Sequence, residues 1–156
     1  MKQENKFNGI YANIEGNNAN PDLKGVVFLY PYRNGTIVEV EVMNMPKDNS
    51  HPYALHIHEG DSCNSADFSS AKGHYNPTNQ THPMHAGDLP PLFSNDGYSY
   101  MSVFTDKFAP EQILGKTVII HSDMDDFKTQ PSGNSGAKIA CGVFVKTEEN
   151  RYWPEF

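Results

Sequence analysis

The 156-residue sequence predicts an all-β protein of eight short strands, arranged as a Greek-key β-barrel or sandwich with two long loops. Two observations predict this class. First, 12 Gly and 11 Pro residues interrupt the chain at short intervals. Second, apolar residues between these breaks alternate with polar ones more often than they recur at helical spacing. The length fits one domain, residues 1–156.

The clearest strand is expected over residues 36–42, where three valines alternate with two glutamates, as in a half-buried strand. Residues 24–31 precede it, and Asn34-Gly35 supply the positive φ values of a tight hairpin turn. A second hairpin is expected over residues 89–106, with its turn at Asn95-Asp96-Gly97. The remaining strand candidates are residues 9–14, 53–58, 116–121 and 138–146.

Charge and hydropathy exclude several classes of partner. The chain carries 12 basic and 19 acidic side chains, a net charge of -7, which opposes binding to nucleic acid or to anionic lipid. Its apolar runs are a few residues long, whereas a membrane-spanning helix needs about 20. The first residues contain no apolar stretch, so we expect a cytoplasmic location, or an extracytoplasmic one if a signal peptide has been removed.

Two cysteines, Cys63 and Cys141, are too few for a disulfide framework or a four-thiolate zinc site, which leaves one bridge or two free thiols. Residues 59–88 and 122–137 lack any periodicity, and both stretches are longer than an unstructured loop in a compact domain usually is. Metal binding together with a disulfide is the most economical explanation of how such loops are ordered.

Histidines are the most informative residue type, because five of the seven fall between positions 56 and 85. In His56-Ile57-His58, the period of a strand places both imidazoles on one face, about 7 Å apart at Cα, while Leu55 and Ile57 face the core. His51, in contrast, is expected to be a solvent-facing histidine without a metal role.

Three imidazoles and one carboxylate follow within a short stretch, and His121 ends a later apolar strand. The donors in the short stretch are His74, His82, His85 and Asp88. Such a set suits tetrahedral zinc. Seven ligands are too many for one ion but suit two, and thiolate-free, imidazole-rich coordination fits copper and zinc.

These residues carry a specific resemblance to a known family. The motifs HIHE, GHYNP, HPMHAGD and IIH, followed by DD and NSGAKIACGV, resemble the copper-zinc superoxide dismutases over nearly the whole chain. The resemblance implies an eight-stranded Greek-key β-barrel, one copper and one zinc ion per subunit, and superoxide as substrate. It also implies that the copper is alternately reduced and reoxidised, and it leaves a homodimer open.

The resemblance also assigns roles to individual residues. It places copper on His56, His58, His74 and His121, and zinc on His74, His82, His85 and Asp88, so that His74 bridges the ions and delivers a proton to the product. It implies that Asp125 hydrogen-bonds His56 and His82 and fixes their tautomers. Finally, it implies a disulfide between Cys63 and Cys141.

One departure from the family pattern concerns Lys138, which stands where the family ordinarily has an arginine that docks superoxide beside the copper. Lysine keeps the charge but lacks the planar, two-pronged donor, so we expect a rate lower by about one order of magnitude or less. Lys128 and Lys138 are the candidates for steering the anion toward the site.

Two other functions share part of this pattern. A copper or zinc store without turnover would need the same histidines, although the intact copper set favours the enzyme. A zinc hydrolase is disfavoured, because four protein ligands would leave the zinc no position for an activated water.

Overall fold

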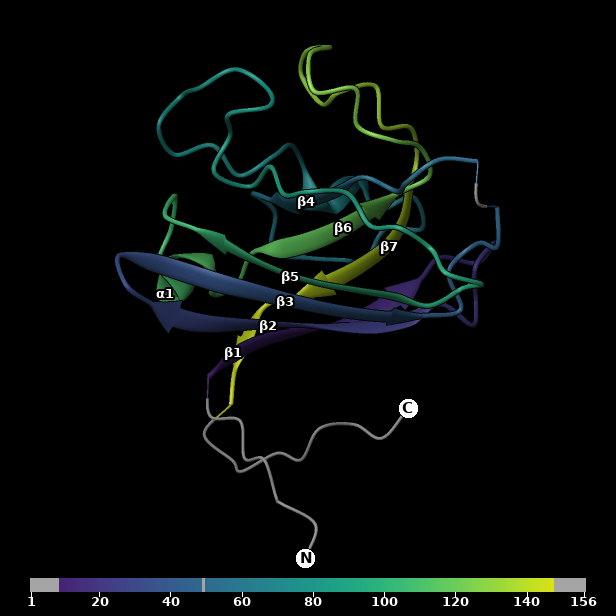
Figure 1. Ribbon diagram of the computed structural model, residues 1–156, viewed down its shortest axis with the longest axis horizontal. Coiled ribbons are helices and arrows are strands. Elements are labelled where there is room, and N and C mark those ends of the chain that lie inside the picture. Colours follow the sequence, from purple (N-terminus) through teal and green to yellow (C-terminus); the bar gives the residue numbers. More distant parts are fainter. Residues whose placement is uncertain (1–8, 49, 148–156) are drawn as a thin grey trace, which may run out of the picture.

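The computed structural model describes residues 9–48 and 50–147. Within them, eight strands form one antiparallel sheet in the order β4-β6-β7-β1-β2-β3-β5, with β8 paired to β1. The strands are β1 (Ile10–Gly16), β2 (Lys24–Tyr32), β3 (Gly35–Met43), β4 (Leu55–His58), β5 (Ser99–Thr105), β6 (Thr117–His121), β7 (Lys138–Val143) and β8 (Val145–Lys146). The sheet curls on itself (Figure 1), which confirms the predicted all-β class and the number of strands.

The order of the strands contains a long crossover. Strand β4 follows β3 in the sequence but pairs with β6 at the far end of the sheet, whereas β3 pairs with β5. This connection is typical of Greek-key topology. Figure 1 shows that the loop after β4 and the loop after β6 leave the same side of the barrel, so the sheet presents both loops at one end.

The hairpin of β2 and β3 follows the predicted alternation. Val38, Val40 and Val42 are fully buried, while the glutamates between them are partly exposed. The turn differs in detail, because the positive φ of 50° falls on Arg33 rather than on Asn34-Gly35. Gly35 already belongs to β3, where a Cβ would overlap the backbone of β5.

Two strand predictions are wrong. The first arm of the expected hairpin over residues 89–106 makes only isolated bridges, among them Tyr53 to Leu92, because Pro90 and Pro91 have no N–H to donate to a ladder. The strand expected over residues 138–146 is interrupted at Phe144, whose backbone bonds to Lys116 and Gly115 instead of to β1. Strands β7 and β8 are the two pieces.

Two short helices were not anticipated, a 3-10 turn η1 (Ser69–Ala71) and a single helical turn α1 (Pro110–Ile113). The side chain of Gln112 accepts a hydrogen bond from the backbone N–H of Ala109 at 2.8 Å and so caps α1. The described part of the chain has no helix with the length and apolar character that a membrane crossing needs.

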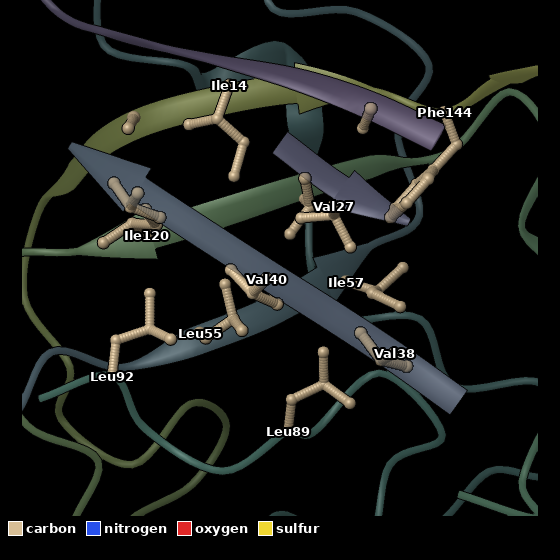
Figure 2. Packing of buried hydrophobic residues seen from close by; sticks show 14 of the residues in the cluster. Ile14, Val27, Val38, Val40, Leu55, Ile57, Leu89, Leu92, Ile120 and Phe144 are labelled. Atoms are coloured by element: carbon tan, nitrogen blue, oxygen red, sulfur yellow. The ribbon is translucent and has the colours of Figure 1, made fainter. Parts of the chain in front are cut away.

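The main core lies between the two halves of the curled sheet. In Figure 2, Val38 and Val40 of β3 pack over Leu55 and Ile57 of β4 and Ile120 of β6, and all five are fully buried. This packing fixes β4 and β6 against the rest of the barrel. It therefore also fixes the opposite faces of these strands, from which the histidines project.

Candidate metal centre

Strand β4 presents two histidines on one face. Leu55 and Ile57 belong to the main core, and His56 and His58 point away from it, with ring centroids 6.3 Å apart. The burial of all four residues shows that the histidine face is also covered. The alternation expected from the sequence therefore holds, and both imidazoles are buried side by side.

The imidazoles of His56, His58, His74 and His121 form one cluster in which one nitrogen from each ring lies within 4.8 Å of the others. His56 Nδ1 lies 3.0 Å from His121 Nε2, and His58 Nε2 lies 3.3 Å from the same atom. Donors bound to one ion at ~2.0–2.1 Å in a tetrahedron are about 3.3 Å apart. These nitrogens therefore have the spacing of ligands to a single metal ion.

A second cluster is built around the Asp88 carboxylate. Its Oδ1 lies 2.8 Å from His74 Nδ1, and its Oδ2 lies 3.1 Å from His82 Nδ1 and 3.2 Å from His85 Nδ1. Three imidazoles and one carboxylate are a donor set that zinc accepts. The side chain of Asp88 is only 4% exposed, so these donors meet away from bulk water.

A ring nitrogen of His56 also lies within reach of the second cluster, since donor atoms of His56, His74, His82 and Asp88 lie within 4.8 Å of one another. However, the Nδ1 of His56 lies 3.0 Å from His121 Nε2 in the first cluster, and the Nε2 of His56 lies 2.8 Å from Asp125 Oδ2. His85 Nδ1 lies 3.2 Å from both His74 Nδ1 and Asp88 Oδ2. We therefore take His85 rather than His56 as the fourth member of the second cluster.

His74 belongs to both clusters through its two ring nitrogens. Its Nδ1 faces Asp88 and His85, whereas its Nε2 is buried without a hydrogen-bond partner among the described residues. The His74 ring centroid lies 4.0 Å from that of His56 and 4.9 Å from that of His58. A buried polar atom without a partner is costly, and a metal ion in the first cluster would satisfy it.

The remaining ring nitrogens of three histidines have fixed partners. The two carboxylate oxygens of Asp125 accept from His56 Nε2 at 2.8 Å and from His82 Nε2 at 2.7 Å. The carbonyl of Lys72 lies 2.7 Å from His58 Nδ1. A proton on each of these outer nitrogens leaves the inner nitrogen free to bind a metal.

Burial and neighbouring charges set the protonation of the clusters. The pKa of His58 is lowered to about 3 and that of His121 to about 2, mainly by burial and in addition by the neighbouring imidazoles. For Asp125, burial alone would raise the pKa, but hydrogen bonds from His56 and His82 bring it well below its ordinary value. Neutral imidazoles beside ionised carboxylates are the forms that bind metal.

Cys63 and Cys141 form a disulfide, which decides between the two alternatives that the sequence left open. The bridge ties the loop after β4 to strand β7 and lies in a small apolar cluster with Phe68, Ala71 and Ile119. This cluster occupies the face of β6 opposite the main core. The loop that supplies four metal-binding candidates is thereby attached to the barrel.

The two lysines proposed to steer substrate lie in different surroundings. Lys138 begins β7 opposite His121 in the ladder, and its positive charge contributes to the lowered pKa of His58, after burial and the neighbouring imidazoles. Lys128 is exposed, and its charge acts on Asp126. A charge contribution to the first cluster is found for Lys138, and a steering role for either lysine stays a prediction.

Sequence reasoning missed three residues beside the clusters. The carbonyl of Lys72 contacts His58, the side chain of Gln130 bonds to the backbone of His82, and Gly133 lies where a Cβ would overlap Asp125 and His82. Each lies in an aperiodic segment, where nothing in the local pattern indicates a partner. His51 lies outside both clusters, with its Nδ1 2.9 Å from the Pro52 carbonyl.

A Greek-key barrel with two adjoining, thiolate-free clusters that share one imidazole defines a class, the two-ion metalloproteins whose ligands are mainly histidine. Comparison with known proteins is more specific. The family model of copper/zinc superoxide dismutase (SODC) matches residues 23–144. The chain belongs to the copper/zinc superoxide dismutase family, and the predicted resemblance is confirmed.

Several relatives show the same family. Superoxide dismutase (Cu-Zn) 1 of Aquifex aeolicus is 36% identical over 134 residues, which cover 76% of this chain and 78% of the relative. The copper-zinc superoxide dismutase of Deinococcus radiodurans is 34% identical over 141 residues, 77% of this chain and 76% of the relative. A crystal structure of a SOD-like protein from Bacillus subtilis superposes with a TM-score of 0.71 at 30% identity, covering 87% of this chain and 98% of the other.

The relatives from Aquifex aeolicus and Deinococcus radiodurans are named superoxide dismutases, which are oxidoreductases, so the prediction of an enzyme of this class is confirmed. Copper and zinc are the metals that the family implies. The two clusters fit them in donor type, in spacing and in protonation.

Proposed function

We propose that the chain converts superoxide to dioxygen and hydrogen peroxide, with copper held by the first cluster and zinc by the second. The observation that carries this proposal is His74, whose two nitrogens face different clusters. The bound copper would supply the one-electron redox chemistry, which zinc cannot perform.

The chain's own residues would then perform three tasks. The outer partners of the rings, Asp125 and the Lys72 carbonyl, hold the inner nitrogens of His56, His82 and His58 toward the metals. His74 Nε2 is the atom that would carry a proton to the product, while its Nδ1 stays anchored in the second cluster. Lys138 would attract the anion to the first cluster on a protein whose net charge of -7 repels it.

Reconstitution of the metal-free protein tests the proposal. Protein loaded with copper and zinc is expected to consume superoxide in pulse radiolysis, and protein loaded with zinc alone is not. His121→Ala should remove the activity of the copper-loaded protein, whereas His51→Ala, a histidine outside both clusters, should keep it. Tight binding of both metals without superoxide consumption would instead identify a metal store.

We also propose that the chain is one dismutase-like domain, which is supported by the single sheet that contains all eight described strands. The absence of nucleic-acid and membrane partners, the cytoplasmic location and the homodimer stay predictions from the sequence.

A further inference from the structure

The loop over residues 122–137 contacts His82, a ligand candidate of the second cluster, at its ring through Asp125 and at its backbone through Gln130. The side-chain amide of Gln130 forms hydrogen bonds with both the N–H and the carbonyl of His82. Gln130 Oε1 accepts from the N–H of His82 at 2.9 Å, and Gln130 Nε2 donates to the carbonyl of His82 at 2.7 Å. The two residues are 48 positions apart, so this contact joins the two long loops.

The amide of Gln130 is itself oriented. Its Nε2 also donates to the carbonyl of Lys128 at 3.2 Å, within its own loop. With the opposite amide orientation, the nitrogen would face the N–H of His82, and the oxygen would face two carbonyls. The hydrogen-bond pattern therefore determines the orientation of the group.

The ring and the backbone of His82 are held by different residues of the same loop. Asp125 accepts from the ring at Nε2, and Gln130 fixes the main chain from which the ring extends. His82 Nδ1, buried and without a hydrogen-bond partner in the described part of the chain, is left 3.1 Å from Asp88 Oδ2. Its direction depends on both supports.

We propose that Gln130 is a positioning residue for the zinc site, which it controls by fixing the backbone of His82. This inference rests on the proposed function, in that it takes the second cluster as the zinc site. Without the two hydrogen bonds from Gln130, the main chain at His82 can shift while the ring remains bonded to Asp125, so His82 Nδ1 leaves its place in the donor set. Loss of a support of this kind typically weakens metal binding by about 10–100-fold.

The test compares Gln130→Met with Gln80→Met. Methionine keeps the length of the side chain but can make neither hydrogen bond to His82. Gln80 is the matched control, because it is exposed, lies in the loop that carries His82 and, among the described residues, uses its side-chain amide on Thr78, at 3.2 Å. Gln130→Glu is the second variant, since it can accept from the N–H of His82 but cannot donate to the carbonyl.

The probe is Co²⁺ bound in place of zinc, followed by its visible ligand-field spectrum and by its rate of loss to excess EDTA. We expect Gln130→Met to lose Co²⁺ about 10–100-fold faster than the wild type, with an altered spectrum. Gln130→Glu should lose Co²⁺ at a rate between those of Gln130→Met and the wild type. Gln80→Met should match the wild type in both measurements.

A Gln130→Met protein with the wild-type spectrum and rate would overturn the positioning role and leave the proposed function standing. If Gln130→Met proves unfolded by circular dichroism, Gln130→Glu decides by the same criteria. If the wild type gives no Co²⁺ ligand-field spectrum at all, the zinc assignment fails, and the inference fails with it.

Discussion

Replacement of Asp125 by asparagine should weaken metal binding through a change of tautomer. The two oxygens of Asp125 accept from His56 Nε2 and His82 Nε2 at 2.8 and 2.7 Å, and its side chain is 1% exposed. Asparagine offers one oxygen and one NH₂ group, so one of the two imidazoles must accept at Nε2. Its proton then moves to Nδ1, the nitrogen that faces the metal cluster.

The size of the effect follows from this loss of one correctly protonated ligand. Residues that orient ligands typically contribute 10–100-fold to metal affinity, or about 1.4–2.7 kcal/mol. We expect that loss at the zinc site if His82 changes tautomer, or at the copper site if His56 does. The hydrogen bond of His82 is the shorter by 0.1 Å, too small a difference to decide between them.

Chelator-competition titrations of the metal-free protein with Zn²⁺ and with Cu²⁺ measure both affinities. Asp48→Asn is the matched control, because Asp48 is exposed and its carboxylate accepts, among the described residues, from Ser50 in a turn, at 2.9 Å. If Asp125→Asn binds both metals within twofold of the wild type, the imidazoles do not depend on this carboxylate, and the reasoning is refuted.

Three further changes test other parts of the structure. Gly133→Ala should lower zinc affinity about tenfold in the same titration, because a Cβ at this position would overlap the carboxylate of Asp125. Gly115→Ala is the control and should leave the affinity unchanged, because Gly115 also has a positive φ but a Cβ there would lie in open space. Lys138→Arg should raise the superoxide rate constant by about tenfold or less in pulse radiolysis, and an unchanged value would show that lysine is no handicap. Replacing Cys63 and Cys141 by serine should remove about 4.5 kcal/mol from the urea unfolding free energy of the metal-free protein, for a separation of 78 residues, and a loss below about 1 kcal/mol would contradict the chain-entropy estimate.

Much of the barrel could be predicted because strands with one core face have a period of two. The valines of β3 and the histidines of β4 follow that period, and the structure has them on the expected faces. The pattern failed where the backbone could not hydrogen-bond to the neighbouring strand. The backbone of Phe144 bonds to Lys116 and Gly115 instead of to β1, and Pro90 and Pro91 have no N–H to donate to a ladder.

The two metal clusters could also be predicted only in part from the sequence. Periodicity alone predicts that His56 and His58 share a face, but it cannot bring the histidines of a 30-residue aperiodic segment to them. Only the family motifs predicted that convergence. Gln130 was missed by both approaches, because its role is defined by the backbone of a residue 48 positions away, and a contact of this kind leaves no trace in the local sequence.

The position of Cys141 has a consequence for the order in which the protein matures. The disulfide attaches the loop after β4 to strand β7. Because the chain is synthesised from its amino terminus, Cys63 leaves the ribosome long before Cys141. The bridge therefore cannot attach that loop to the barrel until β7 has been synthesised. Conditions that keep thiols reduced would delay this attachment.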